Sequence, residues 1–543
     1  MNAIPRSFNA RNFFFSPTKL RSCSRSEEAC ERISLSSVPH AHRAAYRPDG
    51  RLAVRFSIYV KALMTRSAFL AISLLLLSIS TSHAAWTTAH GNADNTGFAR
   101  VDTQPAARAA SVVNVGRVTS GANPVTGPDG TVYVGNVKGE LIALHPDGSP
   151  FWKRQLNEEH GPIVASPVVG SDGSVYVVSS YKFRDHRGGV VRYCESSYLH
   201  KFNSTGAWLG WTLFPASSWP DCTRGLTSAP PNIWRHNGVE AVMIPVVYAG
   251  VDVRLVAFST GLVVLGDVLV TRVPVNNDIT GEAPSFDLGP LRCYYLIFCG
   301  IPFHPPTSVP PFAEAGWPTP GVAIWEYPQG SPYIWVADNW KSTVAYKFDP
   351  ASGFSEIYRF TDKQDRLSSP PVALNNIVAV VGAETRLKFE RQGFEIDWFD
   401  GLITAAPTRM ADGRLAIIER SGGMTVVNGT AVVNQQPLNG QSIASAAASC
   451  THLFVSSTNE LVTFDATNMM PVARLPWTDG GRYAPIIGPQ GHVYAMTKWG
   501  MFVFAPPKRS LLGSILAQTA CDQPVLTTGG VISNINNSRP LMK

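Results

Sequence analysis

The sequence lacks the short motifs by which most enzymes and metal sites are recognised. It contains no Gly-x-Ser-x-Gly elbow, no Gly-rich phosphate-binding loop ending in Lys-Ser or Lys-Thr, no His-Glu-x-x-His and no Cys-x-x-Cys. These absences argue against serine hydrolases, nucleotide-binding enzymes, zinc proteases, zinc ribbons, thioredoxin-like proteins and haem-attached cytochromes. Its histidines are scattered along the chain. The function must therefore be sought in the architecture of the chain.

The chain also has little net charge once its first 84 residues are set apart. The whole sequence carries 46 Lys and Arg against 39 Asp and Glu, a formal charge of +7. Twelve of the basic and four of the acidic residues lie before Ala85, which leaves 34 basic and 35 acidic residues in the remainder. Because the remainder has no dense run of Lys and Arg, it gives no support to nucleic-acid binding.

Residues 64–84 have the order of segments of a secretory signal peptide. Met64-Thr65-Arg66 is basic, an apolar run extends from Ala68 to Ile79, and Ser82-His83-Ala84 supplies a small-x-small exit. A transmembrane helix needs about 20 apolar residues, so this run is too short to span a membrane comfortably. We predict cleavage after Ala84, a periplasmic or secreted product, and no stable membrane span afterwards. A retained signal anchor is the alternative.

Residues 1–63 differ in composition from the rest of the chain. They are rich in Arg and Ser, poor in acidic residues, and without strand or helix periodicity. Because a secretory signal belongs at the start of a protein, we interpret them as a non-native N-terminal extension, with translation starting at Met64. An organelle transit peptide is the alternative. No Cys follows the apolar run, which argues against a lipid anchor.

Six cysteines follow the signal peptide, an even number that permits disulfides in an exported chain. Spacing alone does not determine their connectivity. We expect neighbours in the sequence to pair, as Cys194–Cys222, Cys293–Cys299 and Cys450–Cys521.

A repeated unit predicts the fold class. It reads small residue, Pro, apolar residues, an Asp-Gly or Gly-containing turn and an alternating apolar strand, as in Asn123–Val134, Ser166–Val177, Ala406–Ile417 and Ala484–Ala495. β-Branched and aromatic residues favour strands, and Gly accepts the positive φ of a tight turn. The repeat therefore predicts an all-β protein built from copies of one multi-stranded unit.

The spacing of the repeat predicts a β-propeller of four-stranded blades. The last three intervals are 37, 39 and 39 residues, near the about 40–45 residues of a propeller blade. We predict eight blades, with seven as the alternative. A half-unit beginning at Pro524 could pair with a strand near Ser111–Val118 and close the ring. The eight units start at Pro124, Pro167, Pro230, Pro320, Pro370, Pro407, Ala446 and Pro485.

The unit Ser-Pro-Val-Val-x-x-Asp-Gly-x-Val-Tyr-Val, followed by Gly-x-Leu-x-Ala-Leu and a Trp, resembles the repeat of the pyrroloquinoline-quinone-like (PQQ-like) β-propellers. Residues 121–156 are the best copy of the repeat. Trp86–Phe98 is similar to the segment that precedes the first repeat in that family. The resemblance implies a propeller over residues 85–543. Insertions are expected near 179–225 and 267–316. Such loops on a rigid ring would set binding specificity, or would be loops held by disulfides without a binding role.

The resemblance also raises the question of a cofactor. Enzymes of this family hold the quinone in the central funnel, with a Ca²⁺ ion bound by carboxylate and amide and with an Asp base. No position of this sequence can be assigned those roles, because Asp338, Asp397 and Asp400 are each interpreted as turn residues. We expect no cofactor, no catalytic residue and no metal ligand. PQQ with Ca²⁺ is the alternative.

These observations favour an exported, non-catalytic β-propeller that binds or scaffolds a protein or glycan partner. A periplasmic PQQ-dependent oxidoreductase is the alternative, and it would need charged and aromatic groups that converge in the funnel. A binding module would instead need an apolar or aromatic rim. The candidate rim residues are Trp208, Trp211, Trp219, Trp317 and Trp340.

Overall fold

The computed structural model describes residues 85–507 with several gaps, and this part of the chain belongs to one compact unit, Thr81–Lys543. The predicted extension and signal peptide, residues 1–84, lie outside the described residues. Among the described residues, no helix is long and apolar enough to cross a membrane. The gaps are 157–160, 186–191, 216–224, 226, 249–251, 273–320, 326–329, 339–340, 362–366, 368, 375–377, 383–385, 392–393, 401–402, 404, 429–430 and 499.

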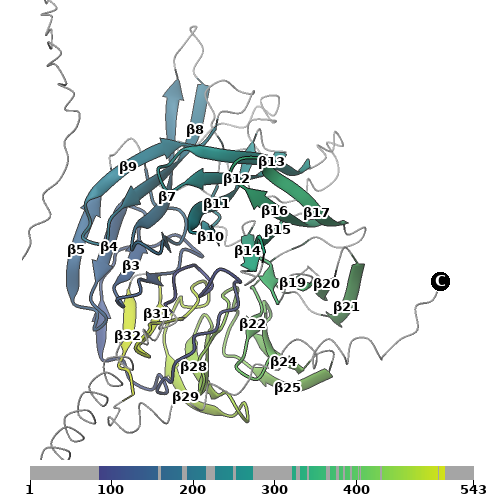
Figure 1. Ribbon diagram of the computed structural model, residues 1–543. Coiled ribbons are helices and arrows are strands. Elements are labelled where there is room, and N and C mark those ends of the chain that lie inside the picture. The colour runs from purple at the N-terminus through teal and green to yellow at the C-terminus, as the bar shows by residue number, and fades with distance from the viewer. Residues whose placement is uncertain are drawn as a thin grey trace, which may run out of the picture. The chain divides into compact units, whose positions relative to one another are not determined.

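The described chain forms eight antiparallel sheets of four strands each, arranged as the blades of a ring (Figure 1). This confirms the predicted all-β fold and makes the protein an eight-bladed β-propeller. In blades 1 to 7 the order of strands in the sheet follows the sequence. Each of the eight predicted units begins within two residues of the first strand of a blade, so the spacing of the repeat located every blade.

The first four blades contain β2 to β17. Blade 1 has β2 (Val125–Thr126), β3 (Val132–Gly135), β4 (Glu140–Leu144) and β5 (Pro150–Gln155). Blade 2 has β6 (Val168–Val169), β7 (Val175–Asp185), β8 (Arg192–Phe202) and β9 (Trp208–Leu213). Blade 3 has β10 (Asn232–His236), β11 (Val239–Tyr248), β12 (Asp252–Ser259) and β13 (Val264–Arg272). Blade 4 has β14 (Gly321–Trp325), β15 (Tyr333–Ala337), β16 (Ser342–Asp349) and β17 (Gly353–Thr361).

The other four blades contain β18 to β32 and β1. Blade 5 has β18 (Val372–Ala373), β19 (Val378–Gly382), β20 (Arg386–Arg391) and β21 (Phe394–Asp400). Blade 6 has β22 (Thr408–Arg409), β23 (Leu415–Glu419), β24 (Gly423–Asn428) and β25 (Ala431–Pro437). Blade 7 has β26 (Ala447–Ala448), β27 (His452–Ser456), β28 (Glu460–Asp465) and β29 (Pro471–Pro476). Blade 8 has β30 (Ile486–Ile487), β31 (Val493–Met496), β32 (Met501–Phe504) and β1 (Ser111–Val113).

The repeated Gly marks the turn between the first two strands of a blade. Gly130, Gly173, Gly413 and Gly491 all have φ between +76° and +87°, a backbone conformation that residues other than glycine rarely adopt. Asp129 precedes the first of these turns, and its carboxylate accepts a hydrogen bond from the backbone N–H of Thr131 at 3.0 Å. Asp172 does the same for Ser174 at 2.8 Å. The motif therefore specifies its turn through both backbone freedom and a local side-chain acceptor.

The core lies between the blades, because both faces of each sheet are apolar. Along β3, Val132 and Val134 belong to the cluster that contains Tyr494 of blade 8. Tyr133 lies between them in the sequence and packs instead with Val177 of blade 2. Alternate residues of one strand thus face opposite neighbours. A blade is buried on both sides only within the ring, so the blades stabilise one another.

The ring is closed by the N-terminal part of the chain. Strand β1 is the fourth strand of blade 8 and pairs antiparallel with β32, with Ser111 opposite Val503 and Val113 opposite Met501. The prediction that a strand near Ser111–Val118 closes the ring is confirmed, but its partner is the Met501–Phe504 strand. The half-unit expected at Pro524 lies outside the described residues.

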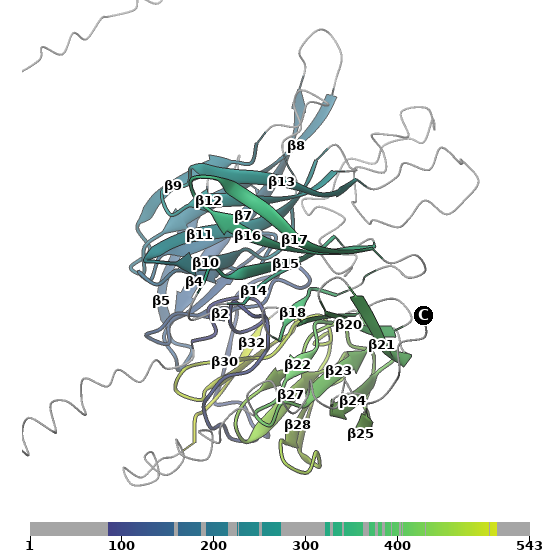
Figure 2. The same ribbon diagram turned by 45° about the vertical axis from the view of Figure 1, so that its right-hand side comes forward.

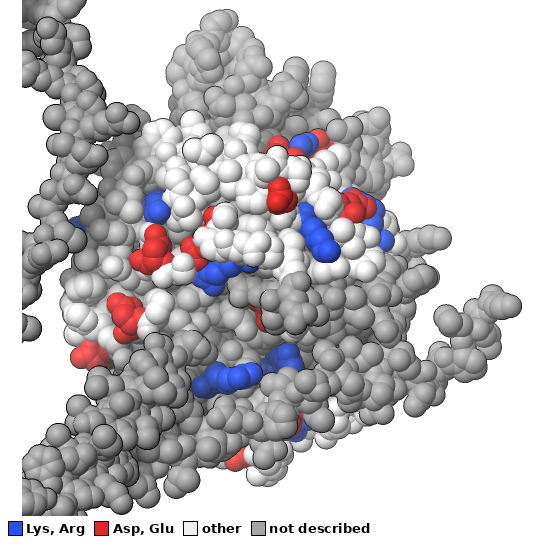
Figure 3. Space-filling model, viewed as in Figure 1, with Lys and Arg blue, Asp and Glu red and all other residues white. Residues whose placement is uncertain are grey.

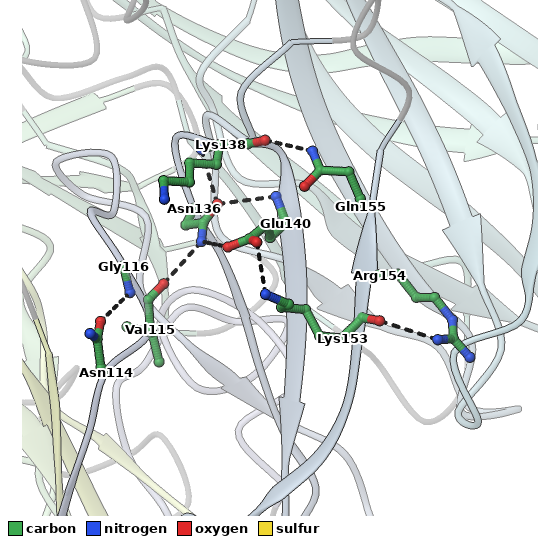
Figure 4. A network of polar contacts seen from close by, with 9 residues as sticks. All are labelled: Asn114, Val115, Gly116, Asn136, Lys138, Glu140, Lys153, Arg154 and Gln155. Carbon is green, nitrogen blue, oxygen red and sulfur yellow. Dashed lines mark hydrogen bonds and ion pairs between the residues drawn. The ribbon is translucent and has the colours of Figure 1, made fainter.

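A polar network fastens the chain where it passes from β1 to blade 1 (Figure 4). The buried Asn136 carboxamide donates to the backbone oxygen of Val115 at 3.0 Å and to the Glu140 carboxylate at 2.7 Å. Its oxygen accepts from the backbone N–H groups of Lys138 and Glu140, each at 3.0 Å. Lys153 of β5 then pairs with Glu140 at 2.9 Å. The Asn136 side chain thus ties Val115 of the closing segment to Lys138 and Glu140 of the first blade.

Blade 2 extends beyond its neighbours. Strands β7 and β8 have 11 residues each and pair along their whole length, and their far ends project from the ring (Figure 2). Much of the expected insertion at 179–225 consists of the strands β7, β8 and β9. Most of the other expected insertion, 267–316, lies outside the described residues, although β13 includes its first residues.

Candidate functional site

The centre of the ring is the place where a propeller of the resembled family would hold its cofactor. In this protein it contains a segment of the chain itself, Trp86–Thr103, which we term the central segment. Figure 1 shows its purple trace running inside the ring of strands. The side chains of Trp86, Ala89, Asn95 and Thr96 are all buried. The centre of the ring is therefore occupied by protein at the level of this segment.

The backbone of the central segment accepts hydrogen bonds from the first strand of six blades. In five of these blades the donor is the second residue of a two-residue strand, so the contact repeats with the blades around the ring. The bonds run from Thr126 N to Trp86 O (2.8 Å), Val169 N to Thr87 O (3.0 Å), Ile324 N to Ala93 O (2.7 Å), Ala373 N to Asp94 O (3.0 Å), Arg409 N to Thr96 O (2.7 Å) and Ala448 N to Gly97 O (2.8 Å).

Two asparagine side chains complete the contacts with blades 3, 4 and 5. Asn95 has a φ of +58°, and its side-chain N–H groups reach the backbone oxygens of Val322 (2.8 Å) and Pro371 (3.1 Å). Asn232 of β10 donates to the backbone oxygens of Ala93 (2.9 Å) and Val322 (2.8 Å). Seven of the eight blades therefore hydrogen-bond to the central segment. It links the blades from inside in addition to the closure by β1.

The central segment ends against blade 7. The backbone N–H of Cys450 donates to the oxygen of Val101 at 3.0 Å. The Thr103 hydroxyl lies 2.8 Å from the Ser449 hydroxyl and 3.0 Å from His452 Nδ1. Burial lowers the pKa of His452, so this imidazole is neutral at pH 7 and can act as a hydrogen-bond partner for the hydroxyl groups. These contacts fix the exit of the segment from the centre.

Burial changes the pKa values of two titratable groups at the centre, His90 and Arg409. Burial lowers the pKa of His90 to about 4, which leaves the imidazole neutral and a weak base at pH 7. Burial also lowers the pKa of the Arg409 guanidinium, and the nearby Asp94 carboxylate opposes that effect. The guanidinium remains charged at any physiological pH. The charged Arg409 and the neutral His90 can supply charge and hydrogen bonds at the centre.

The resembled family raises the question of space for a quinone at the centre of the ring. At the level of the first strands, that centre holds the hydrogen-bonded segment Trp86–Gly97. Within the described residues, no group of three or more His, Cys, Asp and Glu side chains is arranged to hold a metal ion. Asp338, one of the three aspartates considered in the sequence, is fully buried and accepts from the backbone N–H of Ser342 at 2.9 Å, which is the role of a turn residue.

The outer surface carries the exposed apolar side chains. Of the five candidate rim tryptophans, Trp208 and Trp211 lie on β9 and are 56% and 40% exposed. They lie on the outermost strand of blade 2, so they belong to the outer wall of the ring. The remaining three, Trp219, Trp317 and Trp340, lie outside the described residues. Other exposed apolar residues are Val112, Phe151, Leu209, Val239, Val263, Val264, Leu269, Val432, Val433, Met470 and Val472.

Charged side chains are interspersed over the described part of the face in Figure 3, and neither sign dominates it. Several are paired on the blades, including Arg235 with Glu240 at 2.5 Å and Arg254 with Asp267 at 2.7 Å. A surface of mixed sign gives no long-range attraction for a polyanion. The outer wall thus offers apolar and mixed polar contacts.

The sequence analysis noted Trp86–Phe98 as a lead-in but did not foresee its place inside the ring. The signal that points to that place is its composition. Most of its residues are small or polar. Gly91 and Gly97 have positive φ, and Asn95 lies in the left-handed region. A Cβ at Gly97 would lie 3.1 Å from the side chain of Thr408, which shows how closely the backbone approaches blade 6. The predicted disulfides stay predictions, because each pair includes a residue outside the described part.

No protein-family model matches the chain, and no curated protein matches it in sequence. Solved structures are similar in fold. A europium-containing methanol dehydrogenase matches with a TM-score of 0.51 at 11% identity, over 84% of this chain and 96% of its own. BamB from Moraxella catarrhalis matches with a TM-score of 0.45 at 11% identity, over 74% and 99%. The C-terminal WD40 domain of Sif2 has a TM-score of 0.45 at 9% identity, over 75% and 100%. At 11% identity the likeness to the methanol dehydrogenase shows the fold alone.

Proposed function

We propose that this protein is an exported, non-catalytic β-propeller that binds or scaffolds another protein through its outer surface. The observation that supports this most directly is the central segment, because Trp86–Gly97 occupies the space in which the rival oxidoreductase would hold its quinone. Its hydrogen bonds to seven blades make it part of the folded ring. A ligand at this level would have to displace structure on which the ring depends.

The outer wall supplies the surface for a partner. Exposed apolar residues occur on or directly beside the fourth strands of several blades. Examples are Phe151 (43%) on β5, Val433 (47%) on β25 and Met470 (58%) immediately before β29. Edge strands offer both apolar contact and backbone groups that can pair. Scattered apolar residues on a rigid ring suit a protein partner better than a small ligand, which needs a concave pocket.

Export is part of the proposal. The expected signal peptide ends at Ala84, and the central segment begins at Trp86. Cleavage there would free the chain immediately before the residue that enters the ring. The expected pairs Cys194–Cys222, Cys293–Cys299 and Cys450–Cys521 would form in an oxidising compartment. N-terminal sequencing of the purified protein tests this step, and Ala85 is the expected first residue.

The rival function is tested by titrating the purified protein with PQQ and Ca²⁺ while thermal unfolding is followed. A ligand that binds only the folded state raises the midpoint of unfolding as it saturates the site. We expect no change in the midpoint up to millimolar Ca²⁺ and excess quinone. A rise that requires both components would favour the oxidoreductase instead.

The binding function is tested by placing a photo-reactive side chain at Phe151, Val433 or Met470 in the full chain within its native cells. Cross-linking to the same protein from at least one of these positions supports the proposal. Val169 is the matched control, because it is fully buried and should give no cross-link. If no position cross-links to protein while the purified ring retains a glycan on an array, the partner is a glycan and the proposal is wrong in its partner class.

A further inference from the structure

Blades 4 and 5 meet through one large buried side chain and several small ones. Among the described residues, Trp335 of β15 packs with Ala323 and Ala345 of its own blade and with Ala373 and Ala379 of blade 5, and all five are buried. We term this contact the 4–5 joint. On its opposite face, blade 4 packs against blade 3 through a described cluster of branched aliphatic and aromatic side chains. The two faces of blade 4 are therefore packed differently.

Three polar groups on the joint side of blade 4 are buried and have no hydrogen-bond partner in the described structure. They are the indole N–H groups of Trp325 and Trp335 and the hydroxyl group of Thr343. Thr343 lies opposite Ala337 in the β15–β16 pairing, and Ala337 packs with Val381 of blade 5. A buried polar group without a partner costs free energy that it regains in water. All three groups therefore favour a state in which water enters the 4–5 joint.

The inner end of the 4–5 joint is fastened by the central segment. The Asn95 carboxamide donates to the backbone oxygen of Val322 in blade 4 at 2.8 Å and to that of Pro371 beside blade 5 at 3.1 Å. The inner strands also touch, because a Cβ at Gly321 would overlap the ring of Pro370. One side chain thus holds both blades at their inner edge.

Toward the outer wall, the 4–5 joint is lined by aromatic rings that solvent reaches. Tyr333 and Tyr358 pack against the buried Trp335 cluster but are themselves only partly buried. The ring centre of Tyr358, on the outermost strand, lies 6.5 Å from that of Tyr333 and 6.5 Å from that of Trp335. Water therefore lies next to the buried polar groups on the outer side of the joint.

We propose that the ring opens outward at the 4–5 joint, turning about the inner end that Asn95 fastens. Opening gives water to the indole groups of Trp325 and Trp335 and to the hydroxyl group of Thr343, while the inner strands stay together. Blades 1 to 4 and blades 5 to 8 can then shift relative to one another without loss of any sheet. Opening at this joint is independent of the partner binding proposed above.

The first test measures how often a buried position in the joint meets solvent. Ala345→Cys places a thiol on β16 in the 4–5 joint, and Ala143→Cys places one on β4 in the contact between blades 1 and 2. The two alanines are a matched pair, since each is fully buried and each directly precedes the bulge in the pairing of the third and fourth strands. The protein purified from the full chain is treated with iodoacetamide, and mass spectrometry follows the peptide that contains each position.

We expect the thiol at position 345 to react about tenfold faster than the thiol at position 143, because local opening exposes only the first. Unfolding midpoints verify that both variants are folded. Equal rates at the two positions would overturn the proposal, and so would faster reaction at position 143.

The second test changes the balance between the closed and the open joint. Thr343→Val keeps the shape of the side chain and removes its hydroxyl group. Since that group has no partner in the closed ring, we expect the midpoint of thermal unfolding to rise by about 1–3 °C. The matched control is Thr463→Val on β28, also fully buried, whose hydroxyl group accepts from the backbone N–H of Ala106 at 3.0 Å. This control should lower the midpoint.

The two tests are then combined. In the Thr343→Val background, we expect the thiol at position 345 to react about threefold more slowly and the thiol at position 143 to react at an unchanged rate. That pattern supports opening at the 4–5 joint. An unchanged or lower midpoint for Thr343→Val would show that its hydroxyl group has a partner in the closed ring and would overturn the proposal. Equal slowing at both positions would also overturn it, because both thiols would then report unfolding of the whole ring.

Discussion

Asn95 shows how much a single side chain contributes at the centre of the ring. Its carboxamide donates to backbone oxygens of blades 4 and 5, and its backbone adopts the left-handed region that asparagine tolerates better than most residues. The residue combines a permitted backbone conformation with two buried hydrogen bonds. Few residue types could replace it there.

We predict that Asn95→Ala lowers the free energy of unfolding by about 3 kcal/mol. Two buried carbonyl groups lose their donor, which costs about 1–3 kcal/mol, and alanine at positive φ costs about 1–2 kcal/mol more. Denaturant unfolding measures the change. Asn95→Gly separates the two effects, because glycine accepts the backbone conformation but cannot donate. If Asn95→Gly is as stable as the unchanged protein, the hydrogen bonds do not hold the segment.

His90 predicts a dependence of stability on pH. Burial lowers its pKa from 6.5 in the unfolded chain to about 4 in the folded ring. As the pH falls from about 6.5 to about 4, the unfolded chain takes up the proton and the folded ring does not, so folding loses stability in that window. We expect a loss of about 3 kcal/mol attributable to this residue. His90→Gln should remove this part of the pH dependence, and an unchanged profile in the variant would contradict the assignment.

At the scale of elements, the join between β1 and blade 1 depends on Asn136. This side chain is fully buried and makes four hydrogen bonds, to Val115, Lys138 and Glu140 (Figure 4). We predict that Asn136→Ala destabilises the ring by about 3 kcal/mol, because buried backbone groups and a carboxylate lose their partners. Gln155→Ala is the control in the same network, since Gln155 donates only to the exposed Lys138 oxygen. Equal effects of the two variants in thermal unfolding would show that burial of Asn136 is unimportant.

The elements that the sequence predicted are those specified locally. Most blade starts were found because Pro, an Asp-Gly or Gly-containing turn and an alternating strand lie within a dozen residues, as in Ser166–Val177. Gly173 and Asp172 need no distant partner to form their turn. Local signals of this kind can be read from a single sequence. The number of blades followed from the spacing of these signals.

What the sequence did not predict depends on distant partners. A strand near Ser111–Val118 was expected, but its partner Met501–Phe504, near the other end of the described chain, was not. The central segment has no strand pattern, because it bonds to one or two residues of each blade in turn. Trp208 and Trp211 were candidates for an aromatic rim, and their position on the outer wall follows from the order of strands in blade 2. Local sequence patterns do not reveal contacts between residues that lie far apart in the chain.

At the scale of the whole molecule, the central segment couples the blades to one another. Val169, Ala373 and Ala448 donate backbone hydrogen bonds to it from blades 2, 5 and 7. We predict that these three amides exchange with solvent slowly and with similar protection, because all are released only when the segment leaves the ring. Hydrogen exchange followed by mass spectrometry or NMR measures this. Trp86→Ala should increase the exchange of Val169 first, and widely different rates in the unchanged protein would contradict a single coupled unit.

The position of the central segment has a consequence for biosynthesis. Thr103 is made early, but its partner His452 follows 349 residues later. A ribosome or an export channel therefore releases Trp86–Thr103 long before the residues that bind it exist, and early blades wait beside an unfinished neighbour. Contacts of such sequence separation form late and slowly, and the waiting chain exposes strand edges. The protein should need protection by chaperones until the last blade has emerged, and its yield in a foreign host should rise when their supply is increased.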